Sequence, residues 1–216
     1  MIVSKKKPVE ELLAMLEGVK KVALVGCGAC ASACAVGGEK ECAEMKEFLE
    51  ANGFEVAGFV IPDECCQKLL VKKDIKAFRD DGIEAYISLA CGSGCQTVAE
   101  NVDVPVYPAN NTIFLGQTER VGIFNEMCRF CGDCVLGTTG GICPITKCAK
   151  SLVNGPCGGQ KNGKCEVNPE TDCAWIRIYV RLEELGQVEK LYAANNAKSF
   201  ATQFWPRIVN TKEERK

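Results

Sequence analysis

Along residues 8–110, two hydrophobic patterns alternate. One is a short continuous run of apolar residues, and the other is a longer stretch in which apolar residues recur with helical periodicity. The runs predict strands, and the periodic stretches between them predict helices. The predicted strands are residues 21–25, 54–61, 85–90 and 104–107, and the predicted helices are residues 39–51, 67–80, a short one from residue 96 and one near residues 8–17, which docks either on the sheet or on a partner. Because strands joined by helical crossovers pair in parallel, the sequence predicts an α/β fold with a small doubly wound, flavodoxin-like parallel sheet.

The pattern changes from about residue 119. Residues 128–173 hold eight cysteines and many glycines with almost no periodic apolar positions. Such a segment has too little apolar surface for a core of its own, so metal ligation is expected to replace one. We therefore predict two domains, residues 1–118 with the α/β sheet and residues 119–216 with an irregular cysteine-rich iron–sulfur domain and a C-terminal helix over residues 174–185.

Charge and composition exclude several classes of function. A formal net charge of −2 provides no basic field for nucleic acid or an anionic membrane surface. The sequence has no apolar run of 18 or more residues and no signal-peptide pattern at its start, so we expect a cytoplasmic protein. The aromatic residues of the tail, Phe200, Phe204 and Trp205, either dock on a partner or fold back on the chain.

The chain contains 16 cysteines and no histidine. Cytosolic thiols are kept reduced, so this many cysteines indicates metal or redox chemistry rather than a disulfide framework. Without histidine, a zinc site must use cysteine alone or cysteine with carboxylate, and histidine-based acid–base catalysis is excluded.

Cysteines follow three of the predicted strands of the first domain. They are expected to meet at the carboxyl edge of the sheet, where open α/β sheets bind their ligands. Gly26, Gly28 and Ala31 also fit a dinucleotide-binding fingerprint, but this glycine pattern alone is a weak signal. The candidate metal ligands of this domain are Cys27, Cys30, Cys34, Cys66 and Cys91, of which at least one of the first three is surplus to a four-iron cluster; Cys42 is assigned to the core, and Cys95 is divided between the core and the site.

The second domain begins with the spacing used by bacterial ferredoxins. Cys128, Cys131 and Cys134 form C-x2-C-x2-C, and Cys143 precedes a proline as the last ferredoxin ligand does, which favours an iron–sulfur cluster over zinc for this quartet. The later cysteines, Cys157, Cys165 and Cys173 together with Cys148 or Cys143, fit a second cubane or an all-cysteine zinc site equally well. Glycines 155, 158, 159 and 163 allow the backbone to approach the metal and direct N–H groups to sulfur.

The same residues carry a family resemblance. The motifs TGGICP, LVNGPCGG, GKCE and CAWIRIYVRL, together with GCGACASACAVGGEKE, LACGSGCQTV and VYPANNT, make about residues 20–190 similar to the MetV-type small subunit of two-component methylenetetrahydrofolate reductases. The resemblance implies a non-flavin subunit with [4Fe–4S] clusters, bound to a flavin-containing TIM-barrel reductase of one-carbon, Wood–Ljungdahl metabolism. The family pattern has a single cysteine at positions 65/66, and we assign the ligand there to Cys66.

The predicted function is electron relay. A donor, ferredoxin or another iron–sulfur subunit, would supply electrons that pass through two or three [4Fe–4S] clusters to the flavin of the catalytic partner. This chain would then contain no catalytic residue of its own. The alternatives are a zinc-stapled scaffold subunit of the same complex, a stand-alone nucleotide-dependent reductase that uses residues 26–31 as a phosphate loop, and a thiol–disulfide exchanger.

Overall fold

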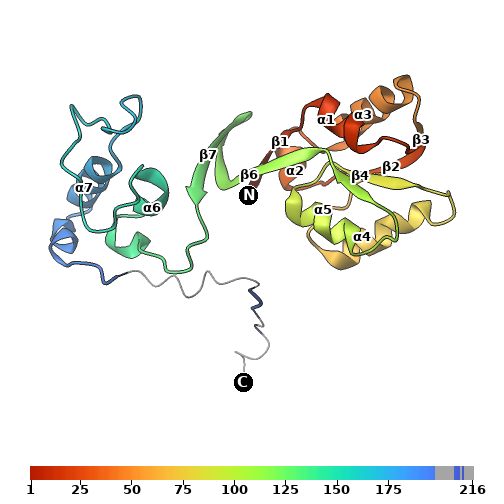
Figure 1. The fold of residues 1–216 in the computed structure, drawn as a ribbon. Coiled ribbons are helices and arrows are strands. Elements are labelled where there is room, and N and C mark those ends of the chain that lie inside the picture. The colour runs from red at the N-terminus through yellow and green to blue at the C-terminus, as the bar shows by residue number, and fades with distance from the viewer. Residues whose placement is uncertain (198–206, 210, 212–216) are drawn as a thin grey trace. The chain divides into compact units, whose positions relative to one another are not determined.

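The computed structural model describes residues 1–197, 207–209 and 211, and the chain divides into two compact units, Met1–Asn125 and Glu126–Lys216. We call these unit 1 and unit 2 (Figure 1). Within the described part of the chain, no helix is both long enough and apolar enough to cross a membrane. The tail residues Phe200, Phe204 and Trp205 lie outside the described residues.

Unit 1 is built on a parallel sheet of four strands in the order β3-β2-β4-β5. Its strands are β2 (Lys21–Val25), β3 (Glu55–Val60), β4 (Ala85–Ser88) and β5 (Val106–Pro108). All four strands that the apolar runs predict are confirmed. The central strand β2 is buried almost throughout because both of its neighbours are strands and both of its faces are covered.

Helices connect these strands as the periodicity predicts. They are α1 (Val9–Met15), α2 (Cys30–Ala33), α3 (Glu39–Ala51), α4 (Lys68–Asp74) with the 3-10 turn η1 (Ile75–Phe78), and α5 (Gly92–Ala99). The helix predicted over residues 67–80 is therefore α4 continued by a tighter turn. Helix α5 begins four residues before the predicted start, because two glycines in its first turn hide the helical pattern.

Two apolar clusters lie on the two faces of this sheet. Leu12 of α1 and Leu49 of α3 are buried in one cluster together with Leu24, whereas Val71 of α4 and Val98 of α5 belong to the other. Neighbouring residues of β2 alternate between the clusters, as side chains of a strand must. Figure 1 accordingly shows α1 and α3 on one side of the sheet and α4 and α5 on the other. Helix α1 thus packs on the sheet.

The fold also contains a second sheet of three strands, which the sequence does not predict. It contains β1 (Ile2–Lys6), β6 (Asn110–Arg120) and β7 (Ile123–Cys128) in the order β1-β6-β7, and β1 pairs with β6 in antiparallel register. The fold is therefore mixed α/β rather than a single parallel sheet. The apolar pattern does not predict these strands, because β6 is mostly polar and β1 ends in lysines, so neither shows an apolar run.

Unit 2 has little regular structure. Its elements are η2 (Leu136–Thr138), α6 (Pro144–Lys147), α7 (Ala174–Glu184) and η3 (Val188–Tyr192). Helix α7 is confirmed where it was predicted, and it buries Trp175, Ile178 and Leu182, whereas Leu185 is exposed. The core of this unit therefore comes from one face of one helix, with Cys148 and Cys173 packed at its margin.

Candidate functional site

The thiols of unit 1 gather at the carboxyl edge of the parallel sheet. Cys27 follows β2, Cys65 and Cys66 follow β3, and Cys91 follows β4 and precedes α5. Strands β2 and β4 are neighbours, but the chain leaves β2 toward β3 on the other side. A crevice opens at such a reversal of strand order, so the position of these cysteines is that of a ligand site in an open α/β sheet.

Cys27 lies in a local environment that favours its thiolate. A hydrogen bond with the side chain of Cys65, together with backbone N–H groups of Cys65, Ala29 and Ala31, lowers the pKa of Cys27 from 9.0 to about 5, although burial opposes the shift. The N–H groups of the glycine-rich turn thus point at a sulfur atom. A dinucleotide would need such groups for its phosphates.

Cys65 is the buried partner in this arrangement, with 1% of its surface exposed. Its Sγ atom lies 2.8 Å from the carbonyl oxygen of Gly26. The hydrogen bond to Cys27, burial and the negative charges of Cys27, Cys91 and Cys66 all raise the pKa of Cys65. These four thiols are therefore close enough to interact electrostatically.

Cys65 is a member of this group that the sequence does not single out. The ligand position is assigned to Cys66 from the sequence, and this assignment stays a prediction. Cys66 is exposed, whereas the side chain of Cys65 hydrogen-bonds to Cys27. The cysteine doublet was the only signal in the sequence. The doublet could not show which of the two side chains points into the domain, because that depends on a contact with α5. Cys65 packs so closely against this helix that a Cβ atom at Gly94 would lie only 2.7 Å from the Cβ of Cys65.

Cys30 and Cys34 face a different neighbour. The backbone N–H of Ile2 donates to the Sγ of Cys30 at 3.4 Å, and the Cys34 thiol donates to the carbonyl oxygen of Ile2 at 3.8 Å. Both cysteines therefore border β1, while Cys27 borders Cys65. The three cysteines of the C-x2-C-x3-C run therefore lie in two places. Cys27 belongs to the cluster of cysteines at the edge of the parallel sheet, whereas Cys30 and Cys34 lie beside β1 of the antiparallel sheet.

The remaining cysteines of unit 1 belong to the packing of the domain. Cys42 is fully buried among the apolar side chains of α3 and β2, and burial raises its pKa to about 12. This is the core position that the sequence predicts. Cys95 lies on α5, where burial raises its pKa and a hydrogen bond with Ser88 opposes the shift.

Four cysteines of unit 2 line one small cavity of about 20 Å³. They are Cys148, Cys157, Cys165 and Cys173, and the cavity is completed by Lys150, Gln160, Glu166, Ala174 and Trp175. The sequence left open whether Cys148 or Cys143 joins the last three cysteines, and Cys148 is the one that lines this cavity. Four sulfur atoms and no imidazole are a donor set that suits zinc or an iron–sulfur cluster.

Glycines shape the loop that presents these sulfurs. Gly155, Gly158 and Gly163 have positive φ angles of 105°, 80° and 77°, which L side chains rarely adopt. The backbone N–H of Gly159 points at the Sγ of Cys157, at 3.5 Å. The predicted N–H group directed at sulfur is therefore present at this glycine.

Charged groups also border the cavity. Lys150 forms an ion pair with Glu166 and also hydrogen-bonds to Cys157, and these contacts raise the pKa of Lys150 and lower that of Glu166. Backbone N–H groups of Asn168 and Val167 lower the pKa of Cys165. The polypeptide around the cavity thus supplies positive charge or N–H donors to two of its four sulfurs.

The ferredoxin-like triplet occupies the first loop of unit 2. Phe130 and Gly132 adopt positive φ angles of 54° and 75°, and the N–H of Phe130 donates to the Sγ of Cys128 at 3.4 Å. The triplet consists of Cys128, Cys131 and Cys134, and Cys143 directly precedes α6. Across residues 1–197, 207–209 and 211, no three Cys, Asp or Glu side chains approach closely enough to coordinate one ion directly.

Comparisons with known proteins bear on the second half of the chain. Residues 107–201, somewhat less than half of the sequence, match a protein family described as "Methylene-tetrahydrofolate reductase C terminal". This match confirms the predicted relation to methylenetetrahydrofolate reductases and leaves the type of subunit open. Searches of curated proteins and of solved structures found no match. The family match covers all eight cysteines of residues 128–173.

Proposed function

We propose that this chain is the non-flavin, MetV-type subunit of a two-component methylenetetrahydrofolate reductase and relays electrons to the flavin of its catalytic partner. The observation that carries the proposal is the cavity lined by Cys148, Cys157, Cys165 and Cys173 within the segment that matches the reductase family. The cavity contains four thiols and no histidine, and in a reductase such a group of thiols is best suited to hold a metal centre that transfers electrons.

The cysteines divide into three groups that suit cluster ligation. The first lines the cavity in unit 2. The second is Cys128, Cys131, Cys134 and Cys143, whose spacing resembles that of ferredoxins. The third, in unit 1, draws on Cys27, Cys30, Cys34, Cys66 and Cys91 as the sequence proposes, with Cys65 added by its contact with Cys27. Iron–sulfur clusters held in these groups would supply one-electron chemistry, with ferredoxin or another iron–sulfur subunit as donor.

The residues around the cavity would tune and protect a bound metal. Lys150 places positive charge beside Cys157, and the N–H of Gly159 is directed at the same sulfur. Both features favour the more negative, reduced state of a cluster. Trp175 closes one side of the cavity, and its indole N–H donates to the carbonyl oxygen of Leu152 at 3.0 Å, so its ring position is fixed.

One observation favours a second candidate, a zinc-stapled scaffold of the same reductase. A cavity of about 20 Å³ has room for little more than one water-sized particle, which suits a single ion. A cubane would require the loops that bear Cys157 and Cys165 to separate. The glycines of the first loop permit such a movement. Zinc would instead require the sulfurs to approach one another, because no three of them in the described residues lie close enough to hold one ion as they stand.

Metal analysis of the anaerobically purified full chain tests both candidates. Iron, acid-labile sulfide and zinc are counted per chain, and an EPR spectrum is recorded after reduction with dithionite. The analysis is repeated on Cys157→Ser and Cys165→Ser, with Cys42→Ala as the control, since Cys42 lies in the apolar core of unit 1.

Each outcome decides between the candidates. About eight irons with matching sulfide, and a reduced-cubane signal that falls by half in the two serine variants but not in Cys42→Ala, would support electron relay through two clusters. Stoichiometric zinc without any EPR signal would contradict the relay and support the scaffold. Transfer of electrons to the flavin of the reductase partner would then be measured by stopped-flow absorbance.

A further inference from the structure

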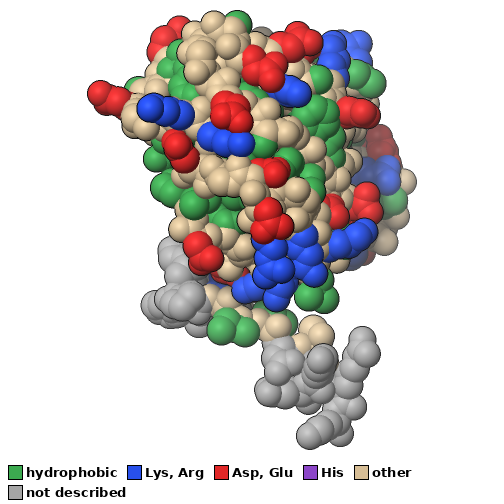
Figure 2. All heavy atoms as spheres, turned by 90° about the vertical axis from the view of Figure 1, so that its right-hand side faces the viewer, with side chains coloured by type: hydrophobic (Ala, Val, Ile, Leu, Met, Phe, Trp, Pro, Cys, Tyr) green, Lys and Arg blue, Asp and Glu red, His purple; other side chains and the backbone are tan. Residues whose placement is uncertain are grey.

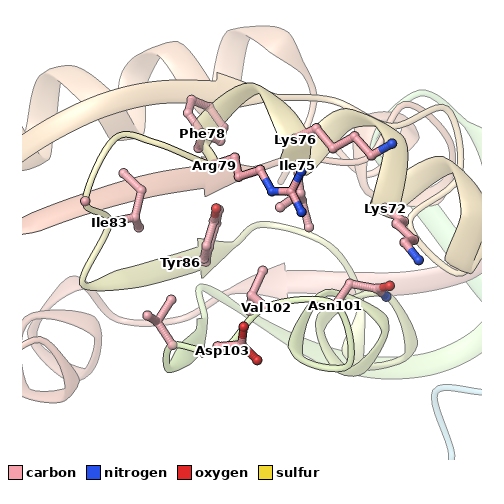
Figure 3. Close-up of a pocket in the computed structure, with 12 residues that line it drawn as sticks. Lys72, Ile75, Lys76, Phe78, Arg79, Ile83, Tyr86, Asn101, Val102 and Asp103 are labelled. Atoms are coloured by element: carbon pink, nitrogen blue, oxygen red, sulfur yellow. The ribbon is translucent and has the colours of Figure 1, made fainter.

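Unit 1 contains a cavity of about 360 Å³ at the edge of the parallel sheet opposite to the cysteines. One wall comes from α4 and η1, and the other from residues 101–104, which lead into β5 (Figure 3). Tyr86, near the start of β4, lies between the two walls. The volume lies in the range of small-molecule sites, which are concave and mostly pre-formed.

Positive charge borders this cavity without a partner. Lys72, Lys76 and Arg79 line it and form no ion pair with any residue in the described part of the chain, although the chain as a whole has a net charge of −2. On the face that Figure 2 draws, Lys and Arg side chains form a group toward the lower edge. In Figure 3 the guanidinium of Arg79 extends into the space between the two walls. Unpaired cations around a cavity favour an anion.

Tyr86 supplies a hydroxyl group to this cavity. The residue as a whole is 5% exposed, and its hydroxyl is not among the fully buried polar atoms that lack a partner. A tyrosine in such a place combines an apolar ring with a polar tip that can bind a ligand. Figure 3 shows this hydroxyl directed into the cavity, toward the side of Phe78 and Arg79. A polar atom of a ligand would satisfy it there.

The remaining surface of the cavity combines apolar side chains with the amide of Asn101 and one carboxylate. Phe78 and Tyr86 are in tilted contact, with ring centroids 6.3 Å apart, and Ile83 and Val102 lie beside them. Asp103 stands on the wall opposite to Arg79 (Figure 3). A ligand that fits this surface has an apolar body, an anionic end for Arg79 and a hydrogen-bond donor for Asp103.

We propose that this cavity binds a small organic oxyanion, a phosphate ester or a carboxylate, whose charged group pairs with Arg79 and Lys76. The guanidinium offers paired N–H donors to either kind of oxyanion, so both share the same recognition chemistry. The Tyr86 hydroxyl binds a polar atom of the ligand, and the apolar body rests on Phe78 and Val102. Since the cysteines lie at the other edge of the sheet, the site does not depend on bound metal.

Calorimetry on the full chain tests the proposal with two probes, AMP for the phosphate ester and citrate for the carboxylate. The variants are Arg79→Gln and Tyr86→Phe, and the control is Lys40→Gln, which removes one charge from the exposed side of α3. We expect one probe to bind with millimolar affinity or better and to bind more weakly as salt rises. We also expect Arg79→Gln to weaken it by about tenfold and Tyr86→Phe by a few-fold.

The result separates the two sources of the oxyanion and can overturn the site. Binding of AMP alone identifies phosphate esters, and binding of citrate alone identifies carboxylates. No binding of either probe at 5 mM, or equal weakening by Lys40→Gln and Arg79→Gln, would overturn the proposal. Metal content is measured on the same samples. Metal content tests the proposed electron relay, and binding of the probes tests the oxyanion site, so the two proposals can fail separately and the failures can be told apart.

Discussion

The side chain of Cys65 hydrogen-bonds to that of Cys27, although the two residues follow different strands of the sheet. The contact shifts their pKa values in opposite directions, down for Cys27 and up for Cys65, which is buried. Two thiols coupled in this way share one proton over a wide pH range. The metal-free, reduced protein therefore contains one thiolate at neutral pH in a place where two ordinary cysteines would both be protonated.

The first prediction concerns this proton. Because the pKa of Cys27 falls to about 5 from 9.0, the folded state holds one proton fewer than the unfolded state between these pH values. Stability of the metal-free protein should therefore rise as pH increases from about 5 to 9. Above pH 9 it should fall, because the raised pKa of Cys65 keeps a proton that the unfolded chain has lost.

Thiolate absorbance at 240 nm, taken as the difference between the wild type and Cys27→Ala, measures this titration. Cys65→Ala removes the donor and should return Cys27 toward its ordinary pKa, whereas Cys65→Ser keeps a donor and should leave much of the shift. An ordinary titration of Cys27 in the wild-type protein would show that the hydrogen bond has no such effect.

The second prediction concerns the close approach of α5 to Cys65. A Cβ atom at Gly94 would lie 2.7 Å from the Cβ atoms of both Ala90 and Cys65. Gly94→Ala gains about 1 kcal/mol of helix propensity, but overpacking costs roughly 1–3 kcal/mol, so a net loss of stability is expected. Urea unfolding of unit 1, followed by far-UV circular dichroism, checks this.

Ser93→Ala is the matched control, because Ser93 lies on the exposed side of the same helix. It should leave stability unchanged or raise it slightly. If Gly94→Ala were as stable as Ser93→Ala, the contact between α5 and Cys65 would be looser than the structure indicates.

The third prediction uses Trp175 as a reporter. Its ring lines the cavity that contains the four cysteines of unit 2 and is 5% exposed. The chain has two tryptophans, so a Trp205→Phe background leaves Trp175 alone. Loading with an iron–sulfur cluster should quench most of its fluorescence by energy transfer, and loading with zinc should change it only slightly. Unaltered fluorescence in a protein shown to hold a cluster would place that cluster elsewhere.

The fourth prediction concerns Lys150, whose ammonium group lies beside Cys157 and Glu166. Lys150→Gln removes a positive charge next to the sulfur of Cys157, so a cluster bound in this cavity, as proposed, should become harder to reduce by roughly tens of millivolts. Potentiometric EPR titration measures the shift. Lys161→Gln, in the same loop but not lining the cavity, is the control, and an equal shift there would indicate a general effect of charge.

The elements that could be predicted from the sequence are those whose apolar residues follow a regular pattern. The runs at residues 21–25 and 85–90 and the periodicity of residues 39–51 depend on burial, and burial leaves a signal in the order of apolar residues. Strand β6 depends on pairing with β1, far away in the sequence, and polar residues can pair as well as apolar ones. For this reason the antiparallel sheet could not be predicted in the same way.

The cysteine groups show a similar limit. Spacing predicted that Cys157, Cys165 and Cys173 act together, and the cavity includes all three with Cys148. Spacing could not separate Cys27 from Cys30 and Cys34, because the turn between them directs one side chain to Cys65 and two to β1. The cavity with Arg79 and Tyr86 left no motif, since its residues are shared among three elements and follow the periodicity of each.

The pairing of β1 with β6 also sets an order of assembly during synthesis. Residues Ile2–Lys6 leave the ribosome before their partners, Asn110–Leu115, which follow more than a hundred residues later. The four parallel strands and their helices have all been made by then, and domains generally begin to fold while the chain is still growing. Strand β1 is therefore incorporated after the strands that are translated later, and Cys30 and Cys34, which border it, stay uncovered by it until it docks.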